Sequence, residues 1–230
     1  MAKRVDVKGQ IVESGNAWVY DWLGIENTSP RKVIMALQEA AGEDVEIYIN
    51  SPGGSVHAAS EIYTELRAYQ GKVRIKITGI AASAASVIAQ AAESEISPTG
   101  MFMIHNVSTS ASGDYRDMDN TAGTLRAANQ SVINAYTGKT GMAPEELQEL
   151  MDKDTYMSAQ QAVDYGFVDR IMFEESPIPL QNGFGMIPEN VINKLRGMIR
   201  EPGGNGQAPS IEKEKAAAQL KLLLMKGEKR

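Results

Sequence analysis

Ser83 stands where a strand is expected to turn into a helix. The apolar residues of 73–77 alternate as in a half-buried strand, and the alanine-rich run 84–92 contains no Gly or Pro, which favours a helix. Amide N–H groups at the start of a helix have no intrahelical partner and can stabilise an oxyanion, so a serine hydroxyl there can act as a nucleophile. Serine is also a favoured helix N-cap, and this stretch alone leaves both interpretations open.

Two histidines are present that could supply the base a nucleophilic serine requires. His105 ends a strand-like run over 101–105, and the carboxyl ends of strands in an α/β sheet border the ligand crevice. His57 falls inside the helix expected to begin at Val56, on its surface or against the sheet. His105 is therefore the better candidate for a general base.

A carboxylate that orients the histidine would complete a catalytic triad. Several aspartates fall near expected loops, and the spacing does not choose among them. These candidates are Asp114, Asp117, Asp119, Asp152, Asp154 and Asp169.

The pair Gly53-Gly54 follows an alternating strand over 45–49. Glycine lets a backbone pass close to another group, because it has no side chain. This loop therefore suits the border of an active site.

The composition is that of an ordinary globular protein, with 230 residues, 43% of them hydrophobic and 23% charged. The net charge of −6 argues against nucleic acid as the main partner. The absence of cysteine excludes disulfides, thiolate catalysis and Cys-ligated metals, and it fits a reducing compartment. The sequence shows no signal peptide, and no run reaches the ~18 apolar residues of a membrane span. We therefore expect a soluble, cytoplasmic protein that engages neither nucleic acid nor a membrane.

Strands alternate with helices along the chain, which predicts the α/β class. The residues 17–23 would place three aromatic side chains on one side if extended, and the polar residues 108–120 are expected to form a loop. Strands are expected over 5–12, 45–49, 73–77, 101–105 and 167–173. Helices are expected over 30–42, 56–66, 84–92 and 125–136, from residue 144, and over 159–166.

The composition changes after Glu174. Pro and Gly residues indicate a linker, followed by a short amphipathic stripe over 191–199 and a flexible spacer over 201–209. Residues 211–230 hold six Lys or Arg against three Glu. We therefore expect a domain over 1–175, a linker with a short amphipathic helix over 176–210, and a charged amphipathic helix over 211–230.

Four motifs occur in order along residues 45–173. They are Ile49-Asn50-Ser51-Pro52-Gly53-Gly54, Gly79-x-Ala81-Ala82-Ser83, Met103-Ile104-His105, and Asp154-x-x-Met157-Ser158-Ala159-x-x-Ala162-x-x-Tyr165-Gly166-x-x-Asp169. Each motif alone is weak, but their order and spacing are specific, and together they resemble those of ClpP-type serine peptidases. They resemble more closely those of the ClpP-like head-maturation proteases of tailed phages and prophages. The run over 82–89, Ala-Ser-Ala-Ala-Ser-Val-Ile-Ala, resembles the phage branch in particular.

The resemblance implies that Ser83 is the nucleophile, that His105 is the general base and then acid, and that Asp154 is its orienting partner. The backbone N–H groups of Gly54 and Ala84 would form the oxyanion hole. The implied fold is the ClpP/crotonase-like spiral of repeated ββα units, and the implied assembly is a ring of identical copies. That chemistry needs no cofactor and no metal.

The expected substrates are capsid, scaffold or portal proteins, processed during phage head assembly in the host cytoplasm. The partnership with an unfoldase ATPase stays open, because the short start before Val5 leaves little chain for axial-gate loops. Two rival functions also remain. One is a crotonase-type acyl-CoA enzyme, which would hold a carbonyl oxygen in the same way, and the other is a catalytically silent, ring-forming assembly factor.

Overall fold

Alternating apolar residues form the central strands of the structure, as the sequence predicts. In β3 (Val45–Gly54) and β4 (Val73–Ala82), the side chains of Ile47, Ile49, Ile75 and Ile77 have no exposed surface. The residues between them are polar and point to the opposite face, because successive side chains of a strand alternate. These strands therefore contribute one apolar face to the core.

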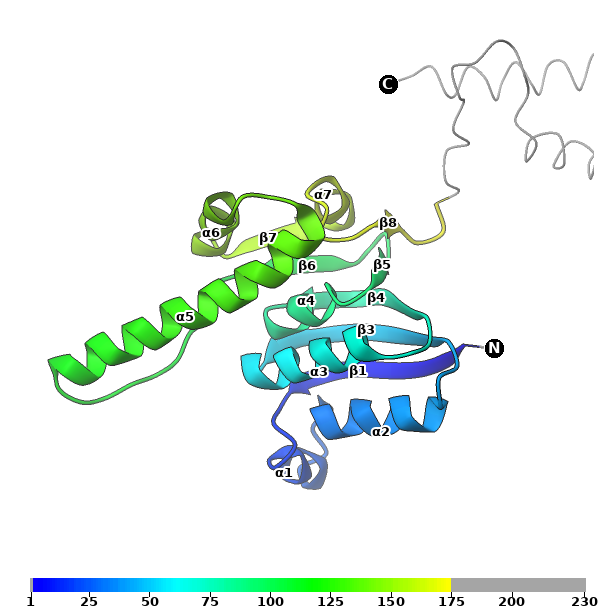
Figure 1. The fold of residues 1–230 in the computed structure, drawn as a ribbon, viewed down its shortest axis with the longest axis horizontal. Coiled ribbons are helices and arrows are strands. Elements are labelled where there is room, and N and C mark those ends of the chain that lie inside the picture. The colour runs from blue at the N-terminus through cyan, green and yellow to red at the C-terminus, as the bar shows by residue number, and fades with distance from the viewer. Residues whose placement is uncertain (1, 175–230) are drawn as a thin grey trace, which may run out of the picture. The chain divides into compact units, whose positions relative to one another are not determined.

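The computed structural model describes residues 2–174, which form a mixed α/β unit (Figure 1). The predicted α/β class is confirmed. The strands are β1 (Lys3–Ile11), β2 (Asn27–Thr28), β3, β4, β5 (Glu93–Ile96), β6 (Met101–Ile104), β7 (Thr155–Ser158) and β8 (Arg170–Ile171). The helices are α1 (Ala17–Trp22), α2 (Pro30–Ala40), α3 (Val56–Ala68), α4 (Ala84–Ile88), α5 (Tyr115–Thr140), α6 (Pro144–Asp152) and α7 (Ala159–Asp164).

The sheet is mostly parallel and divides at β4. Its main path runs β2-β1-β3-β4-β5-β8, while β6 also pairs with β4 and carries the antiparallel strand β7. The first half of β4 pairs with β5 from Arg74 to Ile77, and its last three residues pair with β6. This division brings the end of β4 beside the end of β6.

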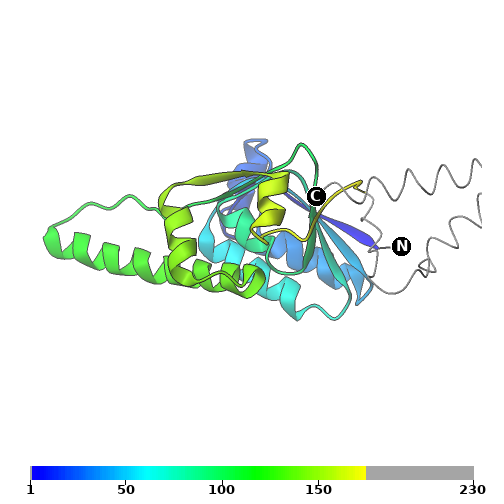
Figure 2. The same ribbon diagram turned by 90° about the horizontal axis from the view of Figure 1, so that it is seen from above.

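Helices α2 and α3 lie along one face of the sheet (Figures 1 and 2). They bury apolar stripes that include Val33 and Leu37 on α2 and Ile62 and Leu66 on α3. Helix α5 begins with a capping box at Asp114 and projects well beyond the other elements (Figures 1 and 2). Only its carboxyl-terminal part contributes buried side chains, so only this part joins the core.

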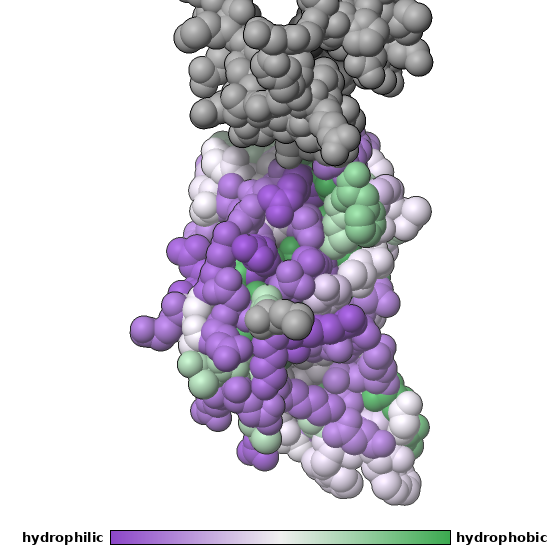
Figure 3. Space-filling view, turned by 90° about the vertical axis from the view of Figure 1, so that its right-hand side faces the viewer, coloured by the Kyte–Doolittle hydropathy of each residue, from purple (hydrophilic) through white to green (hydrophobic). Residues whose placement is uncertain are grey.

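The amino-terminal halves of the central strands carry pairs of opposite charges. Lys76 Nζ lies 3.0 Å from Glu46 on the neighbouring strand and 3.7 Å from Glu95 on the other side. Arg170 on β8 binds both Glu93 and Glu95. Figure 3 looks towards the amino ends of these strands and shows a mainly hydrophilic surface.

Several predicted elements differ from the structure. Residues 17–22 form the helix α1, so Trp18 and Trp22 lie one turn apart on it and are 68% and 79% exposed. The expected loop over 108–120 is shorter, because α5 starts at Tyr115. Helix α4 ends at Ile88 rather than near 92, and the last strand covers only residues 170–171.

The predicted linker over 176–210 and the helix over 211–230 lie outside the described residues. Within residues 2–174, no helix combines the length and the apolar character that crossing a membrane would require. The predicted domain over 1–175 therefore stays a prediction.

Candidate active site

Ser83 occupies a strained turn between β4 and α4. Its backbone angles are φ 55° and ψ −125°, which match the first central position of a type II′ turn, where glycine is usual. The Ser83 N–H donates to the carbonyl of Met103 at 3.0 Å, which fixes the turn against β6. Ser83 occupies the N-cap position of α4, but its side chain makes no capping hydrogen bond. A residue held in such an unfavourable conformation is a candidate for function.

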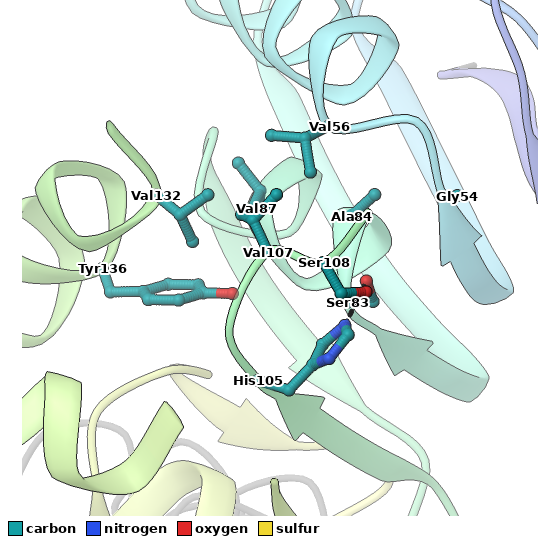
Figure 4. A pocket seen from close by; sticks show the side chains of 10 residues that line it. All are labelled: Gly54, Val56, Ser83, Ala84, Val87, His105, Val107, Ser108, Val132 and Tyr136. Atoms are coloured by element: carbon teal, nitrogen blue, oxygen red, sulfur yellow. Dashed lines mark hydrogen bonds between the residues drawn. The ribbon is translucent and has the colours of Figure 1, made fainter. Parts of the chain in front are cut away.

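The Ser83 hydroxyl faces the imidazole of His105. Ser83 Oγ and His105 Nε2 lie 2.7 Å apart, within hydrogen-bond distance (Figure 4). His105 directly follows β6, and the pairing of Ala82 with Met103 places the two strand ends side by side. Both residues are partly buried. This is the geometry in which a histidine can accept the proton of an attacking hydroxyl.

Two glycines at the end of β3 leave room for this turn. A Cβ atom on Gly53 would lie 2.7 Å from Ser83 Cβ and from the Ala82 carbonyl oxygen, and a Cβ on Gly54 would lie 2.0 Å from the Ile11 carbonyl oxygen. Their φ angles of 104° and 148° also disfavour a side chain. The Gly-Gly sequence is therefore required both by the backbone conformation and by the close approach of β3 to Ser83 and to β1.

A cavity of about 60 Å³ opens beside Ser83 and His105. Gly54 and Ala84, the predicted oxyanion-hole residues, both line it. Its remaining wall is mainly apolar, and the Tyr136 side chain of α5 reaches it from the side opposite Gly54 (Figure 4). The other lining residues are Val56, Val87, Val107, Ser108 and Val132.

Asp154 directly precedes β7 and lies next to His105 in the sheet register. Strands β6 and β7 pair in antiparallel fashion, with Ile104 opposite Thr155. One step further along this register, Asp154 falls opposite His105. Within residues 2–174, however, His105 makes its one side-chain hydrogen bond to Ser83, and none joins it to Asp154. Asp154 is exposed and has a left-handed backbone with φ 49°, just after the end of α6.

The other aspartates that the sequence left open have different surroundings. Asp114 and Asp117 form the capping box of α5, and Asp119 is exposed on the same helix. The Asp169 carboxylate accepts the Ser94 N–H at 2.7 Å and also binds a lysine, so it holds the strand β5. None of these carboxylates is bound to the His105 ring in the described part of the chain.

Asp152 belongs to a polar network beside the general-base candidate. It accepts hydrogen bonds from Asn106 at 2.8 Å and from Gln148 at 2.7 Å, and these bonds hold the pKa of the Asp152 carboxyl below its ordinary value. Asn106, the residue after His105, also accepts a bond from Asn129 of α5. The network therefore ties the chain after His105 to α5 and α6.

The second histidine is not part of this site. His57 is exposed on α3 and lines a separate cavity with Glu13 and Arg31. Among residues 2–174, no group of three or more His, Asp or Glu side chains is arranged to hold a metal ion.

Several residues that shape the cavity cannot be recognised from the sequence. Val132 and Tyr136 fall within the helix expected over 125–136, and a helical pattern does not show which cavity the helix meets. Ser86 appeared only as a feature of the phage-like run 82–89. These residues enter the site through contacts between α5 and α4, which are far apart in the sequence.

Comparison with known proteins identifies the family. The model of the Clp protease family matches residues 24–175. The chain is 31% identical over 137 residues to ATP-dependent Clp protease proteolytic subunit 1 of Chlamydia abortus, covering 57% of this chain and 71% of that protein. It is 32% identical over 148 residues to proteolytic subunit 3 of Rhizobium etli, covering 63% and 76%. With the chloroplastic proteolytic subunit 4 of Arabidopsis thaliana it shares 34% over 142 residues, covering 60% and 49%.

The matched region includes Gly54, Ser83, His105 and Asp154, so the whole candidate site lies inside it. The mostly parallel α/β sheet is also the ClpP-like fold that the sequence predicted. The chain belongs to the Clp protease family of ClpP-type serine peptidases.

Proposed function

We propose that this chain is a serine endopeptidase in which Ser83 is the nucleophile. His105 takes the proton of the Ser83 hydroxyl as Ser83 Oγ attacks the peptide carbonyl, and then gives this proton to the leaving amine. The resulting acyl-enzyme reacts with water, whose proton passes through His105 back to Ser83. The N–H groups of Gly54 and Ala84 stabilise the oxyanion in both steps.

The observation that supports this function most strongly is the 2.7 Å hydrogen bond between Ser83 Oγ and His105 Nε2. It occurs at a strained strand-to-helix turn, beside a cavity lined by Gly54 and Ala84. The proposed role of Asp154 needs a rearrangement, because its carboxylate must reach the ring of His105. Catalytic hydrogen bonds are often loose without substrate, and the adjacent position of Asp154 in the register makes this movement short.

The cavity suggests a preference for small apolar side chains before the cleaved bond. Its valine-rich wall suits a small apolar side chain. We propose capsid, scaffold or portal proteins of a phage as the natural substrates, in the host cytoplasm. Support for this choice comes from the run 82–89, which resembles the phage branch of the family.

We further propose that the chain assembles into homo-oligomeric rings that enclose the site, with the protease domain ending near residue 175. Native mass spectrometry of the full-length chain tests the assembly directly. A population that stays monomeric at micromolar concentration, while it remains active, would contradict the ring.

Replacement of Ser83 by Ala tests the reaction itself. We expect the wild-type protein to react covalently with a fluorophosphonate probe and to cleave a co-expressed capsid protein, and Ser83→Ala to lose both activities by at least ~10³-fold. Ser108→Ala is a matched control, because Ser108 lines the same cavity and makes no hydrogen bond to His105. Undiminished processing by Ser83→Ala would refute the proposal.

The same experiment distinguishes the proposed peptidase from the two rival functions. A crotonase-type acyl-CoA enzyme depends on Glu or Asp acid–base groups, and it predicts no fluorophosphonate labelling. A silent assembly factor also predicts no labelling, together with loss of binding when residues 201–230 are deleted and unchanged function in Ser83→Ala.

A further inference from the structure

Behind the nucleophile lies a buried pair of hydroxyl groups, which the proposed reaction does not use. Ser86 Oγ lies 2.5 Å from the carbonyl oxygen of Ser83 and 2.7 Å from the hydroxyl of Tyr136. Ser86 has no exposed surface, and Tyr136 is only 1% exposed. The two residues are 50 positions apart in the sequence, one on α4 and the other on α5.

The number of available protons fixes the direction of these hydrogen bonds. A carbonyl oxygen can only accept, so the single proton of Ser86 goes to the Ser83 carbonyl. The hydroxyl of Tyr136 must therefore donate to Ser86 Oγ. Burial raises the pKa of Tyr136 far above its ordinary value, so this tyrosine keeps its proton. The result is a chain of two bonds, from Tyr136 through Ser86 to the Ser83 carbonyl, in which each bond strengthens the other.

This chain of bonds determines where the Ala84 N–H points. The C=O of Ser83 and the N–H of Ala84 belong to the same planar trans peptide, so they point in opposite directions. Ser86 holds the carbonyl from one side through its hydroxyl and through its own N–H, at 3.0 Å. The Ala84 N–H is thereby directed to the other side, and Ala84 lines the cavity beside Ser83.

We propose that Ser86 and Tyr136 are positioning residues that hold the Ser83–Ala84 peptide in the orientation needed for oxyanion stabilisation. This inference rests on the proposed function, in which the Ala84 N–H binds the oxyanion. The turn needs such support because the backbone conformation of Ser83 is unfavourable for any residue that has a side chain. Without the hydroxyl of Ser86, rotation of this one peptide would relieve the strain and remove the Ala84 N–H from the cavity.

A hydroxyl near the start of a helix often bonds to a carbonyl three residues earlier, with no role in catalysis. Two observations distinguish this case. The carbonyl in question belongs to the strained residue that carries the proposed nucleophile, and the hydroxyl is itself fixed by a buried tyrosine from another helix. The chain of bonds therefore links the nucleophile turn to α5, which also forms the wall of the cavity.

The test uses three variants of the full-length protein, Ser86→Ala, Tyr136→Phe and the double variant. The second-order rate constant of labelling by a fluorophosphonate probe is measured for each one. Cleavage of a fluorogenic peptide amide with alanine before the cleaved bond gives kcat and KM. Ser94→Ala is the matched control, because Ser94 is also a buried serine, 1% exposed, but its hydroxyl binds Asp169 rather than the turn. Thermal unfolding of every variant identifies any that fail to fold.

We expect Ser86→Ala to lower the labelling rate constant and kcat by about 10- to 100-fold, with KM changed less than about twofold, because only oxyanion binding is weakened. Tyr136→Phe, which removes one oxygen atom, lowers both by about 3- to 10-fold. The double variant matches Ser86→Ala alone, since Tyr136 acts through Ser86. Ser94→Ala retains the wild-type rates.

Three results would overturn the inference alone. If Ser86→Ala folds and is labelled with the same rate constant as the wild-type protein, its hydroxyl does not position the turn. The proposed function would survive this result. An effect of Tyr136→Phe that persists in the Ser86→Ala background would contradict the relay. If Ser86→Ala does not fold, the test depends on Tyr136→Phe. Labelling and cleavage at the wild-type rates by Tyr136→Phe would then reject the inference. A wild-type protein that the probe does not label would instead overturn the proposed function, and this inference with it.

Discussion

The two ends of the same central strands differ in regularity. At their amino-terminal ends, β1, β3 and β4 pair residue by residue, from Lys3 opposite Val45 and from Val45 opposite Val73. Towards their carboxyl ends, the register shifts between Lys8 and Gln10 in one pair and between Ile49 and Ser51 in the other. The regular ends carry paired charges, and the irregular ends carry Gly53, Gly54 and the Ser83 turn.

This difference shows that one part of the sheet stabilises the fold and another part forms the site. The regular halves satisfy their hydrogen bonds and charges at little conformational cost, because no residue there has a positive φ angle. The irregular ends accept left-handed and strained residues, which cost free energy but direct backbone and hydroxyl groups into a cavity. Changes at the carboxyl ends should therefore reduce activity most, and changes at the amino ends should reduce stability alone.

The largest expected effect concerns the carboxylate opposite His105. Replacement of Asp154 by Asn leaves a residue that tolerates the left-handed backbone, but removes the charge that would stabilise the imidazolium. We expect kcat to fall by about 10³- to 10⁴-fold with little loss of stability. The measurement is hydrolysis of the fluorogenic alanyl peptide amide.

Asp152→Asn is the matched control for this change. The amide would still accept hydrogen bonds from Asn106 and Gln148, so we expect kcat to fall less than about 10-fold. The opposite ranking of the two variants would assign the orienting role to Asp152. If both variants lowered kcat by the same small factor, neither carboxylate would orient His105.

Gly53 and Gly42 provide a second comparison, since Gly53 lies near the carboxyl end of β3 and Gly42 lies just before its amino end. Both have positive φ angles, 104° and 87°, so alanine strains the backbone at either position. A Cβ on Gly53 meets Ser83 and Ala82 at 2.7 Å, whereas a Cβ on Gly42 has no neighbour within 4 Å. We expect Gly53→Ala to lower the fluorophosphonate labelling rate by about 100-fold or more, because the collision displaces the nucleophile turn.

Gly42→Ala should label at the wild-type rate. Its cost is the backbone strain alone, which is about 1–2 kcal/mol in the free energy of unfolding. Chemical denaturation measures this cost, and the same assay on Gly53→Ala checks that the protein still folds. A folded Gly53→Ala with normal labelling would show that the close approach of β3 is irrelevant to the site.

The regular parts of the fold were the more predictable parts from the sequence. Alternation over 45–49 and 73–77 predicted the central strands, and helical spacing predicted α3, because each pattern covers at least two periods. The strands β5 and β7 hold only one or two apolar residues each, so they lack the apolar run that predicted β6. The aromatic alternation in 17–23 was misleading, since residues four apart also share a helix face.

The site was predictable only where chemistry depends on residue type. The serine at a strand-to-helix boundary and the histidine at a strand end are both visible in the sequence, and the fold places them 2.7 Å apart. The choice of Asp154 among six aspartates came from the family resemblance, because spacing does not reveal the register of β6 and β7. The pairing of Ser86 with Tyr136 depends on packing between α4 and α5, which no local pattern encodes.

A smaller effect is expected from a change in the cavity wall. Val132→Ala removes two methyl groups from the wall of a cavity of about 60 Å³. We expect the ratio of kcat/KM for leucyl over alanyl peptide substrates to rise by about 10-fold, since a methylene group in an apolar pocket has an effect of this size. Val7→Ala is the control, because Val7 is fully buried in the regular part of β1. A ratio that shifts equally in both variants would exclude the cavity as the specificity pocket.

The smallest expected effect concerns Glu46 on the regular half of β3. Its carboxylate lies 3.0 Å from Lys76 Nζ and accepts the Tyr48 hydroxyl at 3.1 Å, and the bond to Lys76 lowers the pKa of Glu46 below its ordinary value. A carboxyl with a lower pKa in the folded state stabilises the protein above its unfolded-state pKa, and this stabilisation is lost as the pH falls through the folded-state pKa. We expect Glu46→Gln to reduce the free energy of unfolding at pH 7 by about 1 kcal/mol.

The difference between wild type and Glu46→Gln should therefore shrink as the pH is lowered from 7 towards 3, because a protonated glutamate pairs with Lys76 no better than glutamine does. Urea denaturation at several pH values measures it, with fluorophosphonate labelling unchanged at neutral pH. Glu149→Gln is the control, since Glu149 is 74% exposed and lies 3.9 Å from Lys153, so its loss should alter stability by less than about 0.3 kcal/mol. A pH-independent difference would mean that the Glu46 side chain stabilises the sheet by packing rather than by charge. A large fall in labelling would mean that the regular ends of the strands also control the site.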